Sequence, residues 1–147
     1  MTGGSGLVLD ANILIRAVFG NRVRAILERF ENQCDFYTAD VCIDDARKYI
    51  PKLCKKRKLD SELPLAVLRH IVGLVLPVDR SFYNDFELEA RERAQHRDPN
   101  DWPIVAVALL RRCPVWTEDK DFFGAGVATW TTNTVELYLR SAKKTRT

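Results

Sequence analysis

The chain has 147 residues, of which 46% are hydrophobic and 29% are charged, and its formal net charge is +3. This length suits a single domain with a sizeable core, and this composition excludes a disordered polypeptide. No apolar run approaches the ~20 residues that a membrane helix requires, so the sequence also argues against a membrane span.

Four cysteines are spread along the chain without CxxC spacing, and there are only two histidines. These counts disfavour a zinc site, a disulfide framework and a histidine-based catalytic triad. Free thiols are typical of a reducing compartment, so we expect a cytoplasmic protein. Residues 1–6 are rich in glycine and lack the basic and apolar regions of a signal peptide. We expect a flexible lead-in at 1–6, one domain at 7–142 and a basic tail at 143–147.

Short apolar segments alternate with segments of helical periodicity along the chain. Apolar runs bounded by turn residues predict strands at 7–10, 35–38, 74–78, 114–116 and 127–130. Apolar residues at helical spacing predict helices at 11–19, 21–30, 40–53, 61–70, 81–94, 102–110 and 134–142. In the helix at 81–94, we expect Phe82 and Phe86 to point inward. The alternation implies an α/β protein with three layers, in which helices cover both faces of a parallel sheet of about five strands.

Four aspartates lie at the ends of these predicted elements. Asp10 ends the first strand, and Asp45 lies near the start of the third helix. Asp101 precedes the most apolar helix, and Asp119 follows the fourth strand. In a parallel sheet, such positions meet at the edge formed by the carboxyl ends of the strands. Converging carboxylates are costly to desolvate unless a hard cation pairs with them, so the pattern predicts an enzyme that depends on Mg²⁺ or Mn²⁺.

The second acidic position is ambiguous because Asp44 and Asp45 are adjacent. Asp45 shares a helical face with Cys42, Ala46 and Tyr49, whereas Asp44 lies off that face. The helical face favours Asp45, and Asp44 remains its competitor.

Three short motifs occur in order along the chain. Residues 7–12 read Leu-Val-Leu-Asp-Ala-Asn, residues 101–108 read Asp-x-x-Ile-x-Ala-x-Ala, and residues 117–122 read Thr-Glu-Asp-Lys-Asp-Phe. Together they resemble the PIN domain family, and in particular its VapC-like toxin endoribonucleases. The resemblance extends from residue 7 to about residue 134, which is nearly the whole chain.

This resemblance implies a PIN-like fold and an endoribonuclease that hydrolyses phosphodiester bonds of RNA with Mg²⁺ or Mn²⁺. It also implies the toxin of a VapBC-type toxin–antitoxin pair, with an antitoxin protein as partner and commonly a homodimer. One departure concerns the second acidic position, where the family usually has Glu and this chain has Asp45. Because Asp is shorter, we expect its contact with the ion to pass through water.

The predicted active site combines metal ligands with supporting side chains. Asp10 and Asp101 are the expected main ligands, and Asp119 is expected to bind directly or through water. Asp45 is expected to hold the attacking water and to help remove its proton. Supporting roles are expected for polar residues beside these four, namely Asn12, Thr117, Asp44, Asp98 and Asp121.

A basic segment follows the second acidic position. Residues 47–58 contain seven basic residues and no acidic one. A solvated helix face explains such a run as well as a phosphate-binding surface does, but its start beside Asp45 favours the second interpretation. We therefore predict RNA contacts from basic residues near the acidic edge, namely Lys48, Lys52, Lys55, Lys56 and Arg97. Tyr49 and Trp102 are either base-stacking side chains or core aromatics.

Two other functions remain open. The first is a PIN-like module that binds RNA or protein with weak or no catalysis. The second is an α/β phosphatase that forms a phospho-aspartate. It would need a nucleophilic aspartate after the first strand and a nearby lysine, which Asp10 and Lys120 meet only in part.

Overall fold

The computed structural model describes residues 5–95, 98–119, 122 and 124–141. The predicted lead-in is therefore covered only at residues 5 and 6, and the predicted basic tail at 143–147 lies outside the described residues. Gly6 already belongs to the first strand. Among the described helices, none combines the length and the apolar character needed to cross a membrane.

Five strands form one parallel sheet in the order β3-β2-β1-β4-β5. Their bounds are β1 (Gly6–Leu9), β2 (Asp35–Ala39), β3 (Leu76–Val78), β4 (Val115–Trp116) and β5 (Thr129–Trp130). In the central strand, Val8 pairs with Tyr37 on one side and with Val115 on the other. The helices flank this sheet, so the predicted three-layer PIN-like fold with five parallel strands is confirmed.

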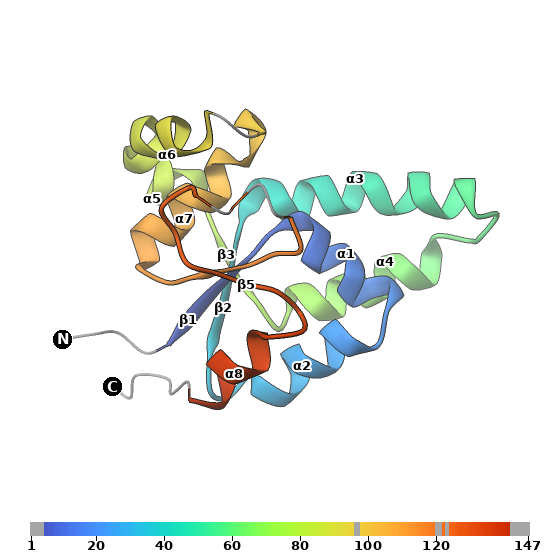
Figure 1. Ribbon diagram of the computed structural model, residues 1–147. Coiled ribbons are helices and arrows are strands. Elements are labelled where there is room, and N and C mark those ends of the chain that lie inside the picture. Colours follow the sequence, from blue (N-terminus) through green and yellow to red (C-terminus); the bar gives the residue numbers. More distant parts are fainter. Residues whose placement is uncertain (1–4, 96–97, 120–121, 123, 142–147) are drawn as a thin grey trace.

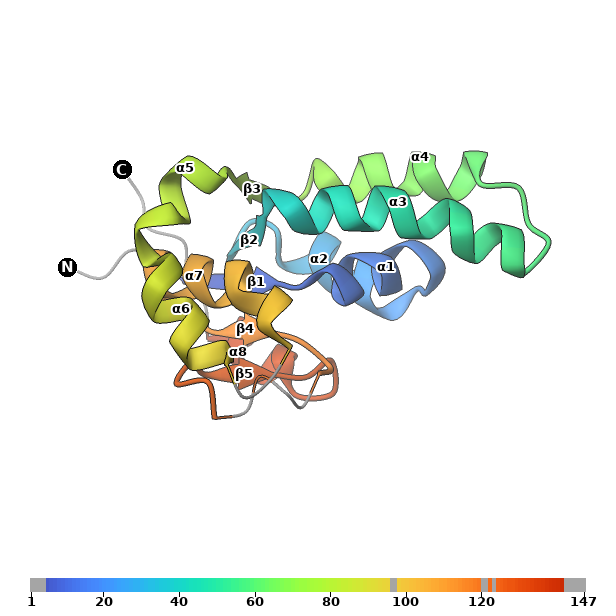
Figure 2. The same cartoon turned by 90° about the horizontal axis from the view of Figure 1, so that it is seen from above.

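The helices that connect the first four strands fall into two groups (Figures 1 and 2). The chain first moves from β1 through β2 to β3 at one edge of the sheet, and it then crosses back to β4 on the other side of β1. The first group joins β1 to β2 and β2 to β3, and comprises α1 (Ala11–Phe19), α2 (Arg22–Phe30), α3 (Asp40–Lys56) and α4 (Glu62–Val72). The second group joins β3 to β4, and comprises α5 (Arg80–Tyr83), η1 (Asn84–Phe86), α6 (Glu87–Ala94), η2 (Pro99–Asp101) and α7 (Trp102–Arg111). A last helix, α8 (Val135–Arg140), follows β5. Because parallel crossovers are right-handed, opposite directions of strand order place the two groups on opposite faces.

The core lies between β1 and the helices that cover it. Leu7, Val8 and Leu9 are completely buried, as expected for a central strand covered on both faces. Helix α7 packs directly on β1, β2 and β4, and its side chains from Trp102 to Ala108 are all buried. This burial explains why the sequences of β1 and α7 are continuous apolar runs. Helices α3 and α4 extend side by side beyond the sheet (Figures 1 and 2).

The predicted helix at 81–94 is interrupted. It consists of α5, the 3-10 turn η1 and α6, and it starts after Asp79, whose carboxylate accepts the Ser81 N–H at 3.0 Å. Phe82, predicted to point inward, is 63% exposed, and Tyr83 is buried in its place. The Tyr83 hydroxyl donates to Asp40 at 2.7 Å, and this long-range bond fixes the side of α5 that faces the protein.

Candidate functional site

The end of β1 places Asp10 at the carboxyl edge of the sheet. Its backbone is extended, and its Oδ1 accepts the Ile13 N–H at 2.9 Å, so Asp10 caps α1. The Thr38 hydroxyl on β2 donates to the Leu9 carbonyl at 2.8 Å and fixes the strand end just before Asp10. The side chain of Asp10 is only 6% exposed.

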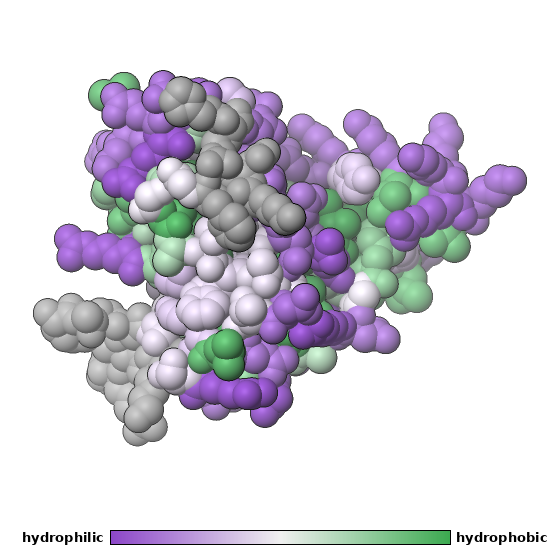
Figure 3. Space-filling view, viewed as in Figure 1, coloured by the Kyte–Doolittle hydropathy of each residue, from purple (hydrophilic) through white to green (hydrophobic). Residues whose placement is uncertain are grey.

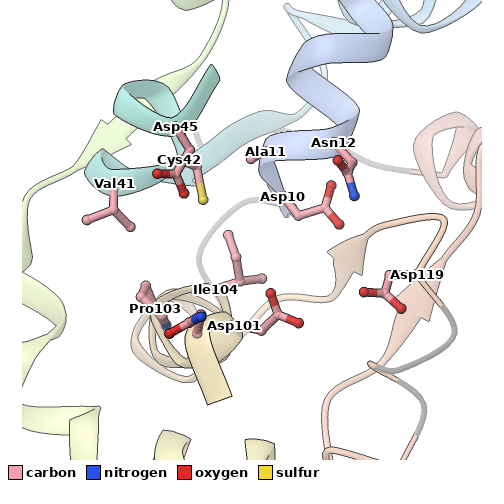
Figure 4. Close-up of a pocket in the computed structure, with 11 residues that line it drawn as sticks. Asp10, Ala11, Asn12, Val41, Cys42, Asp45, Asp101, Pro103, Ile104 and Asp119 are labelled. Atoms are coloured by element: carbon pink, nitrogen blue, oxygen red, sulfur yellow. The ribbon is translucent and has the colours of Figure 1, made fainter. Parts of the chain in front are cut away.

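Asp10 lines a cleft of about 200 Å³ with the other three predicted carboxylates. Figure 4 shows Asp10, Asp101 and Asp119 entering this space from three different elements, with Asp45 reaching in from α3. The complete lining is Asp10, Ala11, Asn12, Val41, Cys42, Asp45, Asn100, Asp101, Pro103, Ile104 and Asp119. The fold thus brings together the four aspartates that the sequence singled out.

Burial dominates the electrostatics of Asp10. The pKa of its carboxyl is raised from 3.8 to about 6, mainly by desolvation and to a smaller extent by the negative charges of Asp119 and Glu118. Hydrogen bonds from Thr117 and from the Ile13 N–H act in the opposite direction without cancelling the effect of burial. Asp10 is therefore a carboxylate whose charge the protein alone compensates poorly.

Thr117, directly after β4, joins two of the carboxylate segments. Its hydroxyl donates to Asp10 Oδ2 at 2.5 Å, and its oxygen accepts the Asp119 N–H at 2.9 Å. The next side chain, Glu118, accepts the Thr132 N–H at 2.6 Å and so fastens the same loop to the segment after β5. These bonds fix the loop that carries Asp119 relative to Asp10.

The structure separates the two adjacent aspartates of α3. Asp45 lines the cleft, whereas Asp44 is exposed outside it and pairs with Arg47 at 3.7 Å. The expected inward face is shifted, because Asp45 and Tyr49 are exposed to solvent and Ile50 is buried instead. The geometry agrees with the choice of Asp45, and its catalytic role stays a prediction.

The turn before α7 separates Asp98 from Asp101 in a similar way. Asp98 is exposed and accepts the Asn100 N–H at 3.0 Å, which opens the turn η2. Asp101, at the end of this turn, lines the cleft, and within the described part of the chain its side chain makes no capping hydrogen bond to α7. The turn therefore directs one carboxylate into the cleft and uses the other to shape the backbone.

A family comparison agrees with this arrangement. The sequence pattern described as the PIN domain matches residues 8–140. The chain belongs to the PIN domain family. No curated protein sequence matches this PIN domain.

Solved structures similar to this PIN domain include proteins of toxin–antitoxin systems. VapBC2 from Rickettsia felis, solved with a DNA fragment from its promoter, has a TM-score of 0.63 at 14% identity, covering 86% of this chain and 98% of that chain. FitAcB from Neisseria gonorrhoeae has a TM-score of 0.59 at 25% identity, covering 86% and 97%. A toxin–antitoxin complex from Klebsiella pneumoniae has a TM-score of 0.55 at 19% identity, covering 86% and 97%. These likenesses establish the fold.

The chemistry of the cleft of this PIN domain fits a hard divalent cation, because its polar side chains present carboxylate and amide oxygens and Asp10 is buried without full charge compensation. Among the described residues, no three His, Cys, Asp or Glu side chains stand close enough to hold an ion together. Cys42 also lines the cleft, and burial raises the pKa of its thiol to about 12, so the thiol is neutral in the cation-free protein.

The remaining predicted site residues lie in different settings. Asn12, in the first turn of α1, is exposed and lines the cleft. Trp102 is buried, 6% exposed, and packs edge-on to Tyr83, which makes it a core aromatic. The predicted RNA-binding lysines of α3 are all exposed, namely Lys48, Lys52, Lys55 and Lys56. Asp121 and Arg97 lie outside the described residues.

Several residues around the site escaped the sequence interpretation. Glu118 was visible only as a neighbour of Asp119, Arg57 only as a member of the basic run at 47–58, and Arg16 carried no motif. Helical spacing relates both arginines to residues near the predicted site, because Arg16 follows Asn12 by four residues and Arg57 follows Tyr49 by eight. That relation becomes a specific signal only when α1 and α3 are known to pack against each other.

Proposed function

We propose that this protein is an endoribonuclease that hydrolyses phosphodiester bonds of RNA with Mg²⁺ or Mn²⁺. The observation that carries the proposal is the cleft in which Asp10, Asp45, Asp101 and Asp119 meet at the carboxyl edge of a PIN domain sheet. The uncompensated burial of Asp10 supports a cation at this place. A bound divalent ion would neutralise charge on the phosphate and activate water for its hydrolysis.

The residues of the cleft divide the remaining work. Asp10 and Asp101 would hold the ion, and Asp119 would complete this set directly or through water. Thr117 fixes the positions of the Asp10 carboxylate and the Asp119 backbone relative to each other through its two hydrogen bonds. Asp45, exposed at the rim, accepts the proton of the attacking water. Asn12 orients groups at the open side of the cleft.

A cleavage assay with matched variants tests this proposal. The purified protein is incubated with a mixture of single-stranded RNAs in Mg²⁺, in Mn²⁺ and in EDTA. We expect cleavage with either ion and none in EDTA. Asp101→Asn should lower the rate at least 100-fold, whereas Asp85→Asn, which removes an exposed carboxylate on η1, should cleave like the parent. Equal cleavage by the parent and Asp101→Asn would overturn the nuclease proposal and favour a PIN-like binding module.

We further propose that the protein is the toxin of a VapBC-type pair in the cytoplasm. The support is the likeness to solved toxin–antitoxin structures and the absence of a disulfide among its four cysteines. An antitoxin is then the expected protein partner. Induced expression of the parent alone should arrest growth of a host cell, and Asp10→Asn should relieve the arrest. Normal growth with an active parent enzyme would reject the toxin role and leave the nuclease proposal standing.

The homodimer implied by the resemblance stays a prediction. Three apolar residues of α1 are candidates for such an interface, and the alternative is that they belong to the core. Ile13 and Val18 are 0% and 7% exposed and belong to the core, and Phe19 is partly buried against it. Light scattering of the purified protein over a range of concentrations measures its mass, and a monomer at every concentration would contradict the prediction.

A further inference from the structure

The acidic cleft continues into a groove between α1, α3 and the loop after β4. Asn12 and Asp119 line both the cleft and a larger hollow of about 460 Å³. This hollow is lined by Ile15 and Arg16 of α1, by Tyr49, Leu53 and Arg57 at α3, and by Glu118. Arg16, Arg57 and Glu118 line in turn a third hollow that reaches Arg22 and Asn133. We name the second hollow and its continuation the arginine groove.

The side chains change in character along this path. Asp45, Tyr49, Leu53 and Arg57 follow one another at intervals of four residues, so each is turned roughly 40° from the last around the axis of α3. Arg57 caps the end of this helix, and Tyr49, Leu53 and Arg57 line the same hollow. At about 1.5 Å per residue, Tyr49 lies roughly 6 Å and Arg57 roughly 18 Å from Asp45 along the helix axis. The path thus runs from carboxylates, past an aromatic ring that is 49% exposed, to guanidinium groups.

Arg16 and Arg57 differ from the six described arginines that form ion pairs. Arg91 and Arg93, for example, are held by carboxylates at 2.7 and 3.0 Å. Within the described part of the chain, no carboxylate lies within ion-pair distance of Arg16 or Arg57. The Arg57 guanidinium instead lies over the Phe19 ring at 5.6 Å, which holds it at the groove without neutralising it.

One negative group shares the groove. Glu118 lines the same hollows, but its carboxylate is engaged by the Thr132 N–H at 2.6 Å. Arg22 is engaged as well, because it donates to Asn133 Oδ1 at 2.9 Å and closes the far end of the groove. Arg16 and Arg57 are therefore the two guanidinium groups available to an external anion.

We infer that the arginine groove binds single-stranded RNA on one side of the scissile phosphate, with backbone phosphates on Arg16 and Arg57 and a base stacked on Tyr49. The inference rests on the proposed nuclease function and names the path of its substrate. A single strand fits because its unstacked bases can reach an exposed ring while its phosphates follow a line of cations. Arginine is suited to the phosphates because its planar fork donates two parallel hydrogen bonds.

This path differs from the one predicted from the basic run of α3. Helical geometry turns Lys48 and Lys55 about 100° and 120° away from the direction of Tyr49. Lys52 and Lys56 flank that direction, at roughly 60° and 20°, and Arg57 is turned by roughly 80°. Of these three, only Arg57 lines the hollow, so the lining and not the helical angle distinguishes it. In Figure 3, hydrophilic side chains gather at the end of the molecule to which α3 and α4 extend in Figure 1. Arg16 and Arg57 are distinguished by lining the hollows that continue the acidic cleft.

Binding, measured apart from cleavage, tests the inference. All proteins carry Asp101→Asn so that the RNA stays intact, and fluorescence anisotropy follows a labelled 12-nucleotide single-stranded RNA in Mg²⁺. The groove variant is Arg16→Gln with Arg57→Gln. The matched control is Arg69→Gln with Arg140→Gln, which removes the same charge from two exposed arginines that do not line the groove. Circular dichroism and thermal melts verify that each protein is folded.

We expect the groove variant to bind RNA at least tenfold more weakly than the parent and the control to bind like the parent. Loss of two phosphate contacts should also reduce the slope of log affinity against log salt by about 1.4. Tyr49→Ala should weaken binding three- to tenfold, and Tyr49→Phe, which keeps the ring, should restore it. Equal affinities of the groove variant and the control would overturn the inference.

The two proposals fail in different ways. RNA binding through Arg16 and Arg57 by a parent that never cleaves RNA would reject the nuclease and keep the groove. Cleavage by a parent whose affinity does not depend on these arginines would reject the groove and keep the nuclease. If an acidic peptide binds the groove and does not compete with RNA, the groove is a protein-binding site and the inference is wrong.

Discussion

The Thr117 hydroxyl donates a hydrogen bond to Asp10 Oδ2 at 2.5 Å, across 107 positions of the sequence. The same oxygen accepts the Asp119 N–H at 2.9 Å. Asp10 and Thr117 are both buried, at 6% and 1% exposure, so water cannot replace either bond easily. One small side chain therefore joins the first acidic motif to the last.

Thr117→Val should separate the role of this hydroxyl from that of the side-chain volume. The change leaves a buried carboxylate without its side-chain donor, so we expect the free energy of unfolding to fall by about 1–3 kcal/mol. Cation affinity should fall about 10- to 100-fold, because an orienting partner is lost. Urea unfolding and calorimetric Mn²⁺ titration measure the two effects. Thr117→Ser keeps the hydroxyl and should stay close to the parent, whereas equal losses in both variants would assign the effect to packing.

Asp10 should make the stability of the cation-free protein depend on pH. Its folded-state pKa of about 6 lies above the ordinary 3.8, so the folded protein holds this proton more tightly than the unfolded chain does. The stabilisation is present below pH 3.8 and is lost as the pH rises through about 6, and the total loss is about 3 kcal/mol.

Asp10→Asn removes this titration and keeps an acceptor for the Ile13 N–H. In EDTA, the variant should therefore be more stable than the parent at pH 7, by an amount that shrinks as the pH falls to 4. Urea unfolding of both proteins between pH 4 and 7.5 measures the difference. A stability difference that stays constant over this range would show that Asp10 does not titrate there.

The sequence was sufficient to predict that Asp10, Asp101 and Asp119 converge. Each stands just outside an apolar element, and a parallel sheet sends the ends of such elements to one edge. Periodicity could not decide which side of α5 faces the protein, because Phe82 and Tyr83 are both aromatic. A hydrogen bond from Tyr83 to Asp40, 43 positions away, settles that choice. The arginine groove is also a tertiary feature, because it exists only where α1 and α3 pack together.

Asp45 and Asp44 form a natural pair of variants, because they are adjacent and both exposed. Asp45→Asn removes a carboxylate that lines the cleft, so we expect RNA cleavage at least tenfold slower than in the parent. Asp44→Asn removes only the surface pair with Arg47 and should change neither cleavage nor stability by more than about 0.5 kcal/mol. Initial rates at saturating Mg²⁺ compare the two. Slow cleavage by Asp44→Asn with normal cleavage by Asp45→Asn would reverse the assignment of the second acidic residue.

Trp102 and Tyr49, the two aromatics near the acidic edge, should respond differently to truncation. Trp102 is 6% exposed, and the guanidinium groups of Arg80 and Arg91 lie over its ring at 5.3 and 4.8 Å. Trp102→Ala should therefore lower the free energy of unfolding by about 3–5 kcal/mol. Tyr49→Ala, at a side chain that is 49% exposed, should lower it by less than about 1 kcal/mol.

Urea unfolding gives both stability changes, and RNA anisotropy of the folded proteins gives the complementary result. Because Trp102 is buried beneath two arginines, its truncation should leave RNA affinity within twofold of the parent wherever the variant is folded. Tyr49→Ala should weaken RNA binding while remaining stable. A stable Trp102→Ala protein with weakened RNA binding would contradict the core role, because it would require the indole ring to reach the nucleic acid.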